Sequence, residues 1–326
     1  MAAHPELVPG VRPGAPPPRL TGLDHADGGM ANETLLIDLG PEHPGVVVRL
    51  PPLEATYADY DLAPQALMQN AVAAAGVPAP APALAVTSEE WIGSPFLVMP
   101  RVRGQIPGSA PPFDPWVTSL GPAGQQKIHD GFIDTLVAIH AIDWSAHGLA
   151  AAYPPQSLGA ALGRWSAYVA WAGEGEPLPA LVEALAWCER HQPPDDEAPV
   201  LVWGDPRLGN LVYDESLAVH AVLDWDLAGV APRGMDLGWH FGLEFMMGRL
   251  FDQQVPGFPA PAAVLARYES ASGHTVTHLG WHEVFALVRA LAINDRHQRI
   301  EGSRRRRENP MGEILLERMR AADSEV

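Results

Sequence analysis

Apolar and polar positions divide the chain into a strand-rich beginning and a helix-rich remainder. Short apolar runs bounded by turn residues predict strands near 20–26, 33–39, 45–50, 83–87 and 95–99, with a helix over 60–75. Beyond residue 120, apolar residues at helical spacing predict helices near 124–142, 236–250, 258–271, 280–301 and 310–322, and two more within 157–190. Two short strands, 200–203 and 218–223, interrupt these helices. The pattern therefore predicts an α+β chain.

The same pattern predicts how the chain is organised. Residues 1–19 are rich in proline, glycine and alanine without periodicity, which indicates a mobile leader. A strand-rich part is expected over 20–102 and a mostly helical part over 103–326. Within the second part, the proline-rich 105–120 is expected to be a loop and 229–236 a link between strand and helix.

Composition excludes several classes of function. With 326 residues, 47% of them hydrophobic, the chain is long enough to bury a core. A formal charge of −18 argues against a nucleic-acid partner, because that binding needs a basic surface. Apolar runs stay shorter than the ~18 residues of a membrane span, and a signal-peptide pattern is missing, so we expect a cytoplasmic protein without membrane contact.

The spacing of the cysteine and histidine residues does not predict a metal site. A single cysteine, Cys188, excludes a disulfide framework and a multi-cysteine zinc site, and it is expected to be a small core residue. His129 and His140 share one predicted helix without the H-E-x-x-H spacing, and the sequence shows no third ligand for them.

Three oxygen-bearing side chains stand at the ends of the two short strands in the helical part. Asp205 and Asn210 lie in the loop after 200–203, and Asp224 ends the strand 218–223. Such a set suits phosphoryl transfer, in which a carboxylate orients the attacking hydroxyl and oxygen ligands hold Mg²⁺. The alternative is a polar hairpin in an unrelated α/β domain, but the ordered G-D-x-x-x-x-N with Asp fourteen positions further on favours the kinase interpretation.

At these residues the chain resembles the aminoglycoside phosphotransferase-like kinase family, whose loop is H-G-D-x-x-x-x-N. The wording W-G-D-P-R-L-G-N is more similar to the subgroup that includes the kinase-like domain fused to some acyl-CoA dehydrogenases. The resemblance implies a bilobal protein-kinase-like fold with a small antiparallel sheet and one main helix in the N-lobe. It also implies Asp205 as catalytic base or hydroxyl orienter, and Asn210 and Asp224 as Mg²⁺ ligands.

The same resemblance assigns supporting residues around this loop. Trp203 stands where the family has histidine. Asp236 is expected to brace the loop through backbone hydrogen bonds, and His140 is expected to be a buried structural residue beside it.

Further residues are implied for ATP. The segment Gly28-Gly29-Met30-Ala31-Asn32 resembles the family's G-G-x-S-N phosphate loop, with Gly28, Gly29 and Asn32 at matching positions; a plain hairpin turn is the alternative. Because the only lysine is Lys127, the phosphate-binding cation is expected to be Arg49, with Gln65 as its partner.

A last apolar strand and its continuation resemble the hinge between kinase lobes, where backbone groups meet the adenine. Met99 would line the back of the nucleotide pocket, while the Pro100 carbonyl and the Val102 N–H would face the adenine edge. The alternative for Met99 is simple core packing.

The sequence thus predicts an ATP- and Mg²⁺-dependent kinase of a hydroxylated small molecule, monomeric or homodimeric. The acceptor is expected to be a hydroxyacyl metabolite or an aminoglycoside-like alcohol. Trp165, Tyr168 and Trp171 are expected to pack in the core, with contact to the acceptor as the alternative. The alternative is a non-catalytic nucleotide-binding module, prompted by Arg49, Gln65 and Trp203. Arg304 to Arg307 form either a solvated connection or an anchor for a phosphate-bearing acceptor.

Overall fold

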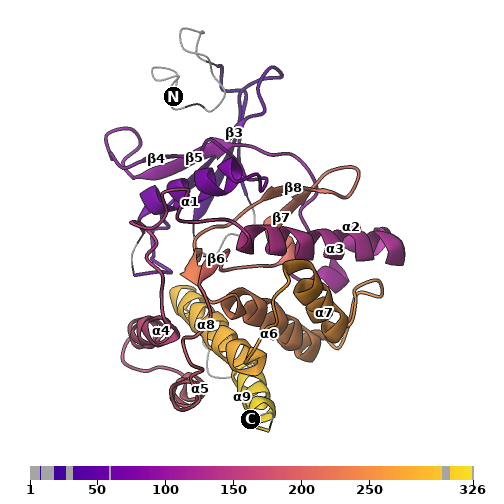
Figure 1. Cartoon of the computed structure of the whole chain (residues 1–326). Coiled ribbons are helices and arrows are strands. Elements are labelled where there is room, and N and C mark those ends of the chain that lie inside the picture. Colours follow the sequence, from indigo (N-terminus) through magenta and orange to yellow (C-terminus); the bar gives the residue numbers. More distant parts are fainter. Residues whose placement is uncertain (1–7, 9–17, 27–31, 59, 303–308, 325–326) are drawn as a thin grey trace.

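In the computed structural model, which describes residues 8, 18–26, 32–58, 60–302 and 309–324, a small sheet with one helix stands above a larger helical part (Figure 1). The predicted phosphate-loop residues Gly28 and Gly29 lie outside the described residues, as do Arg304 to Arg307 and most of the leader. The division of the chain at residue 102 stays a prediction.

The sheet of the smaller part is antiparallel in the order β1-β2-β3-β5-β4. Its strands are β1 (Gly22–His25), β2 (Glu33–Asp38), β3 (Val46–Leu50), β4 (Leu84–Val86) and β5 (Phe96–Pro100). Alternation along β3 sends Val46 and Val48 into a cluster with Ile37 and Val98, while Val47 packs in the cluster on the α1 side. Arg49 shares the face of Val47 because side chains alternate, which directs its guanidinium away from the first cluster.

One helix, α1 (Leu62–Ala74), covers this sheet. Asp61 caps its N-terminus by accepting from the Ala63 N–H at 3.1 Å, and Gly76 follows its end at φ +93°. Its buried residues Leu62 and Ala66 pack with Leu97 of β5. The prediction of one helix between the third and fourth strands is confirmed.

Helices make up most of the larger part. Among the described residues they are α2 (Pro115–Ser119), α3 (Gly121–His140), α4 (Leu158–Ala172), α5 (Pro179–Arg190), α6 (Gly234–Phe251), α7 (Pro261–Ser272), α8 (Leu279–Ile300) and α9 (Met311–Asp323). α6 and α8 approach so closely that a Cβ on Gly238 would lie 2.4 Å from the backbone carbonyl carbon of His282. This contact fixes the start of α6, which carries Asp236, against the core.

Two short hairpin-like pairs lie between the helices and the sheet. β6 (Val200–Val202) pairs with β9 (Gly229–Ala231), and β7 (Leu211–Tyr213) pairs with β8 (Val219–Val222). The expected plain link over 229–236 was wrong, because its first residues form β9. Strand β9 holds β6, which precedes the loop over 203–210, and β8 holds β7, which follows it; this loop is called the catalytic loop below.

The expected loop over 105–120 was also wrong. It contains a 3-10 turn, Pro111–Phe113, and then α2, which begins because Asp114 accepts from the Val117 N–H at 2.8 Å and Pro115 has no N–H to satisfy. Before the turn, Gln105 exchanges two backbone hydrogen bonds of 2.8 Å with Tyr213. These bonds join the connection after β5 to β7.

Candidate active site

A buried carboxylate holds the backbone of the loop that follows β6. Asp236, fully buried at the start of α6, accepts from the backbone N–H groups of Trp203 at 2.7 Å and Gly204 at 2.8 Å. His140 lies 3.1 Å from the same carboxylate through Nε2 and 2.6 Å from the Tyr268 hydroxyl through Nδ1. The predicted bracing role of Asp236 and the structural role of His140 are confirmed.

Glycine is required at position 204. Its φ of +93° is rare for other residues, and a Cβ there would lie 2.1 Å from the carbonyl oxygen of Leu227. The tight turn at Gly204 places the next residue, Asp205, at the mouth of the loop. Both the positive φ of this turn and the close approach of Leu227 therefore require glycine here.

Three donors fix the carboxylate of Asp205. Its Oδ2 accepts from Asn210 Nδ2 at 2.8 Å and from Arg207 Nε at 2.9 Å, and its Oδ1 accepts from Trp239 Nε1 at 2.6 Å. Asn210 Nδ2 also donates to the Asp205 carbonyl at 3.0 Å. The side chain of Asp205 keeps 14% of its area exposed, so the carboxylate is both oriented and reachable.

The structure places Asp224 on the other side of Asn210. The Leu223 N–H donates to the Asn210 carbonyl at 2.8 Å, and Asp224 follows in a left-handed conformation at φ +58°. Burial and the neighbouring charge of Asp226 raise the pKa of Asp224 to about 6, although Arg49 opposes this. The structure thus brings together the three oxygen-bearing side chains that the sequence singled out.

The residue set fits a hard cation. Asn210 uses its amide nitrogen for both hydrogen bonds to Asp205, which leaves Oδ1 as the atom available to a metal ion. The Asp224 carboxylate is 32% exposed and supplies a charged oxygen. Oxygen ligands of this kind, one carboxylate and one amide, are what Mg²⁺ takes from proteins that bind it together with phosphates.

Trp203 stands at the position where the family motif has histidine, and it holds the backbone at Asp224. Its indole Nε1 donates to the carbonyls of Leu223 at 2.8 Å and Asp224 at 3.1 Å, and its ring packs between Phe132 and Trp225. Trp203 therefore anchors the backbone that carries Asp224.

Arg49 reaches this site from the sheet. Its Nη2 lies 2.9 Å from Asp226 Oδ2 and 3.6 Å from Asp224 Oδ1, and Asn32 Nδ2 donates to the same Asp226 oxygen at 2.5 Å. Burial would lower the pKa of Arg49, but Asp226 and Asp224 outweigh it and raise the pKa. Two residues expected at the nucleotide thus face the catalytic loop across the two parts of the chain.

The expected partner of Arg49 was wrong. Arginine has only donors, so Gln65 could orient it only through Oε1, and that buried atom has no hydrogen-bond partner among the described residues. Asp226, two positions after Asp224, takes this role. The sequence contained the residue, but nothing in its spacing linked it to a strand 177 positions earlier.

The hinge residues lie at the end of β5. Met99 is 5% exposed, packs in the cluster with Leu62 and Ala66, and its sulfur lies 3.4 Å from Gln69 Nε2. Pro100 is the last residue of the strand, opposite Val46 in the register. Contact of Met99, Pro100 and Val102 with adenine stays a prediction.

A layer behind Asp205 was not identified from the sequence. Trp239 on α6 donates to Asp205, and the guanidinium of Arg289 on α8 lies 4.6 Å from the Trp239 ring centroid and 5.2 Å from that of Trp165. Arg289 also donates to the Gly204 carbonyl at 3.2 Å. Burial lowers the pKa of Arg289 to about 10, so it is still a cation at pH 7.

The aromatic residues of α4 mainly pack. Trp165 is 6% exposed in the core, the Tyr168 hydroxyl donates to the Thr56 carbonyl at 2.8 Å, and Trp171 lies under Arg296 at 4.8 Å. Tyr168 therefore ties the segment between β3 and α1 to the helical part. An acceptor contact through these side chains stays a prediction.

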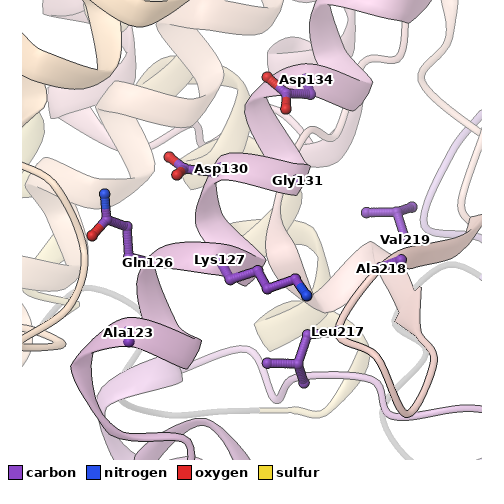
Figure 2. Close-up of a pocket in the computed structure, with 9 residues that line it drawn as sticks. All are labelled: Ala123, Gln126, Lys127, Asp130, Gly131, Asp134, Leu217, Ala218 and Val219. Carbon is purple, nitrogen blue, oxygen red and sulfur yellow. The ribbon is translucent and has the colours of Figure 1, made fainter.

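A separate open pocket of about 420 Å³ lies between α3 and the β7–β8 turn (Figure 2). Lys127 extends along it near Leu217, with Asp130 and Asp134 further along α3. Asp205, Asn210 and Asp224 are not among its lining residues. This pocket is therefore distinct from the site around the catalytic loop.

Comparisons with known proteins agree with this geometry. Residues 25–288 match the model of the phosphotransferase enzyme family (APH). A curated relative, acyl-CoA dehydrogenase family member 11 of Gallus gallus, is 31% identical over 179 residues, which cover 53% of this chain and 22% of that protein. The chain thus spans about a fifth of that relative's length.

Solved structures show the fold. A putative aminoglycoside phosphotransferase from Ralstonia eutropha JMP134 has a TM-score of 0.74 at 23% identity, covering 98% of this chain and 97% of that one. A thermostable mutant of aminoglycoside phosphotransferase APH(4)-Ia, in a ternary complex with AMP-PNP and hygromycin B, has a TM-score of 0.62 at 13% identity, covering 94% and 96%. The predicted protein-kinase-like fold is confirmed. Within the described residues, no helix is long and apolar enough to cross a membrane. With most of its length matched by the family model, this chain belongs to the phosphotransferase enzyme family (APH).

Proposed function

We propose that this phosphotransferase moves the γ-phosphoryl group of ATP to a hydroxyl of a small molecule, with Mg²⁺ as cofactor. The observation that carries the proposal is the Asp205 carboxylate, which is fixed by three donors. One of these donors is Asn210, and Asp224 lies near it at the end of the neighbouring hairpin. The nucleotide analogue and the hydroxylated ligand named with one structural neighbour support the two substrate classes.

Asp205 would orient the attacking hydroxyl through Oδ1. Each carboxylate oxygen has two lone pairs, and Oδ2 already accepts from two side chains, whereas Oδ1 accepts from Trp239. Oδ1 therefore keeps an acceptor site for the hydroxyl and, as the bond to phosphorus forms, for its proton. The three donors hold the carboxylate in one orientation before the substrate arrives.

Asn210 and Asp224 would hold the metal ion, and Arg49 the nucleotide. A bound Mg²⁺ neutralises charge on the transferring phosphoryl group. Arg49 carries five N–H donors and uses Nη2 on the acids, so the others remain for phosphate oxygens. Asn32, a residue of the predicted phosphate loop, keeps Asp226 in position for this cation.

For the acceptor we propose a hydroxyacyl compound, with an aminoglycoside-like alcohol as the alternative. Phe113 and Phe251 are 50% and 41% exposed and meet edge to face at 5.2 Å. The loop that precedes Phe113 contacts the catalytic loop, because the Pro107 carbonyl would lie 3.2 Å from a Cβ on Gly209. This exposed aromatic pair, on the segment that continues from that contact, suits an amphipathic acceptor better than a polycationic one.

The test is ATP-dependent phosphorylation of a panel of hydroxyacyl thioesters, free hydroxy acids and aminoglycosides, read as a mass gain. Asp205→Asn should lower turnover by about 10²- to 10⁴-fold and leave the affinity for Mg·ATP within a few-fold. Asp196→Asn, an exposed aspartate in the connection before β6, is the matched control. ATP binding without transfer to any class would favour the non-catalytic module, and equal turnover in Asp205→Asn would refute the assigned role.

A further inference from the structure

A second cluster of potential ligands lies away from the catalytic loop, between α3 and α6. His129 comes from α3, and His240 and Glu244 lie one turn apart on α6. The Nε2 atoms of His129 and His240 are 3.8 Å and 3.7 Å from Glu244 Oε1. One ligand atom from each of the three residues lies within 4.8 Å of the other two.

Three of the four ring nitrogens of these histidines are buried without a hydrogen-bond partner among the described residues. His129 is 1% and His240 is 4% exposed. Neither ring nitrogen of His129, nor Nε2 of His240, has a partner among the described residues. Distances of 3.7 and 3.8 Å exceed those of hydrogen bonds, about 2.7–3.2 Å. Buried polar atoms are nearly always satisfied, so these nitrogens point to a missing partner.

The types of ligand atom suit a metal ion. Transition metals bind imidazole nitrogens in the neutral form and carboxylate oxygens in the ionised form. The cluster supplies two imidazoles and one carboxylate, each with one ligand atom.

We propose that His129, His240 and Glu244 form a site for a divalent transition metal, with Zn²⁺ as the preferred ion. Two imidazole nitrogens and one carboxylate oxygen are borderline ligands that favour Zn²⁺ over Mg²⁺. Bonds of about 2.0–2.2 Å at tetrahedral angles place ligand atoms roughly 3.4 Å apart. The two separations from Glu244, 3.7 and 3.8 Å, need to shorten by a few tenths of an ångström, and the ligand atoms of the two histidines, within 4.8 Å of each other, have to approach to the same distance.

Glu244 is the exposed edge of the cluster. The Glu244 side chain is 32% exposed, whereas two phenylalanines close the opposite side. The ring centroid of Phe132 lies 4.8 Å from that of His240, and the ring centroid of Phe258 lies 4.9 Å from that of His129. A water molecule would complete the coordination from the exposed side. The site is independent of the proposed kinase mechanism because it shares no residue with it.

The metal would fasten α3 to α6 behind the catalytic loop. Phe132, between the two histidines, also packs against Trp203 with ring centroids 6.4 Å apart. α6 begins with Asp236, which holds the backbone of Trp203 and Gly204. The role is therefore structural: the ion would stabilise the helix pair on which the catalytic loop rests.

The test uses tag-free full-length protein stripped with a chelator and titrated with Zn²⁺ by calorimetry, and with Co²⁺ followed by visible absorption. We expect one ion per chain, a rise in melting temperature with Zn²⁺, and Co²⁺ bands without a thiolate charge-transfer band, which excludes Cys188. Glu244→Gln and His240→Gln should each weaken Zn²⁺ binding at least tenfold. The exposed His220→Gln should bind as the wild type does.

Two results would overturn the site. One is a wild-type chain that takes up no stoichiometric Zn²⁺ at 100-fold molar excess. The other is binding that persists unchanged in Glu244→Gln, which replaces a partly exposed carboxylate by an amide of the same shape and so should fold. Circular dichroism of each variant in the metal-free state separates a folding defect from lost coordination.

Discussion

The hydrogen bond from Trp239 to Asp205 offers a direct test of how the catalytic carboxylate is oriented. Trp239→Phe removes the Nε1 donor, 2.6 Å from Oδ1, and keeps an aromatic ring in a site that is 5% exposed. Asn210 and Arg207 still hold Oδ2, so the carboxylate keeps its place but loses the donor that fixes its rotation. We therefore expect impaired turnover without a loss of the fold.

The size of the effect follows from the bond. A hydrogen bond to a charged group contributes about 1.5–3 kcal/mol. If all of it serves to orient Oδ1 in the transition state, kcat falls by roughly 10- to 150-fold.

Trp187 provides a matched control for this variant. Its Nε1 donates to Asp323 at 3.0 Å, it is 4% exposed, and it lies on α5, with none of the active-site residues bonded to it. Trp187→Phe should lose similar stability in a urea titration while kcat stays within twofold of the wild type. Equal kcat values for Trp239→Phe and Trp187→Phe, with acceptor and Mg·ATP saturating, would refute the orienting role.

Two further predictions concern the metal-side acid and the turn of the loop. The pKa of Asp224 is raised above its ordinary 3.8 to about 6, so the folded state holds this proton more tightly than the unfolded state does. The contribution of Asp224 to stability is therefore full below pH 3.8 and is lost as the pH rises to 6. Mg²⁺ binding grows over the same window, because it needs the ionised carboxylate. Asp226→Asn removes the repelling charge, so the midpoint of Mg·ATP binding against pH should fall below 6; an unchanged midpoint would contradict the assigned cause. Gly204→Ala forces a Cβ to within 2.1 Å of a carbonyl oxygen at positive φ, and we expect it to cost more than about 2 kcal/mol of unfolding free energy by denaturant titration. Gly175→Ala, also at positive φ but with nothing within 4 Å, should cost only about 1 kcal/mol, and equal losses would show that the clash is unimportant.

The sequence alone determined the local parts of the site. Asp205 and Asn210 are five positions apart around a 3-10 turn, Leu208–Asn210, so their contact follows from the chain's own geometry. Asp224 ends a strand paired with β7, which directly follows Asn210, and a short hairpin brings these ends together. Helical periodicity likewise placed α4 and α5, since each buries one apolar face.

Tertiary structure decided which distant side chains meet. Trp239 reaches Asp205 from another helix, Asp226 rather than Gln65 pairs with Arg49, and His129 meets His240 across two helices. None of these pairs has a diagnostic spacing, because their separation along the chain is set by how the elements pack and not by the period of any one element. Sequence therefore identified the chemical groups of the catalytic loop, and packing alone selected the donors, cation partner and second ligand cluster around them.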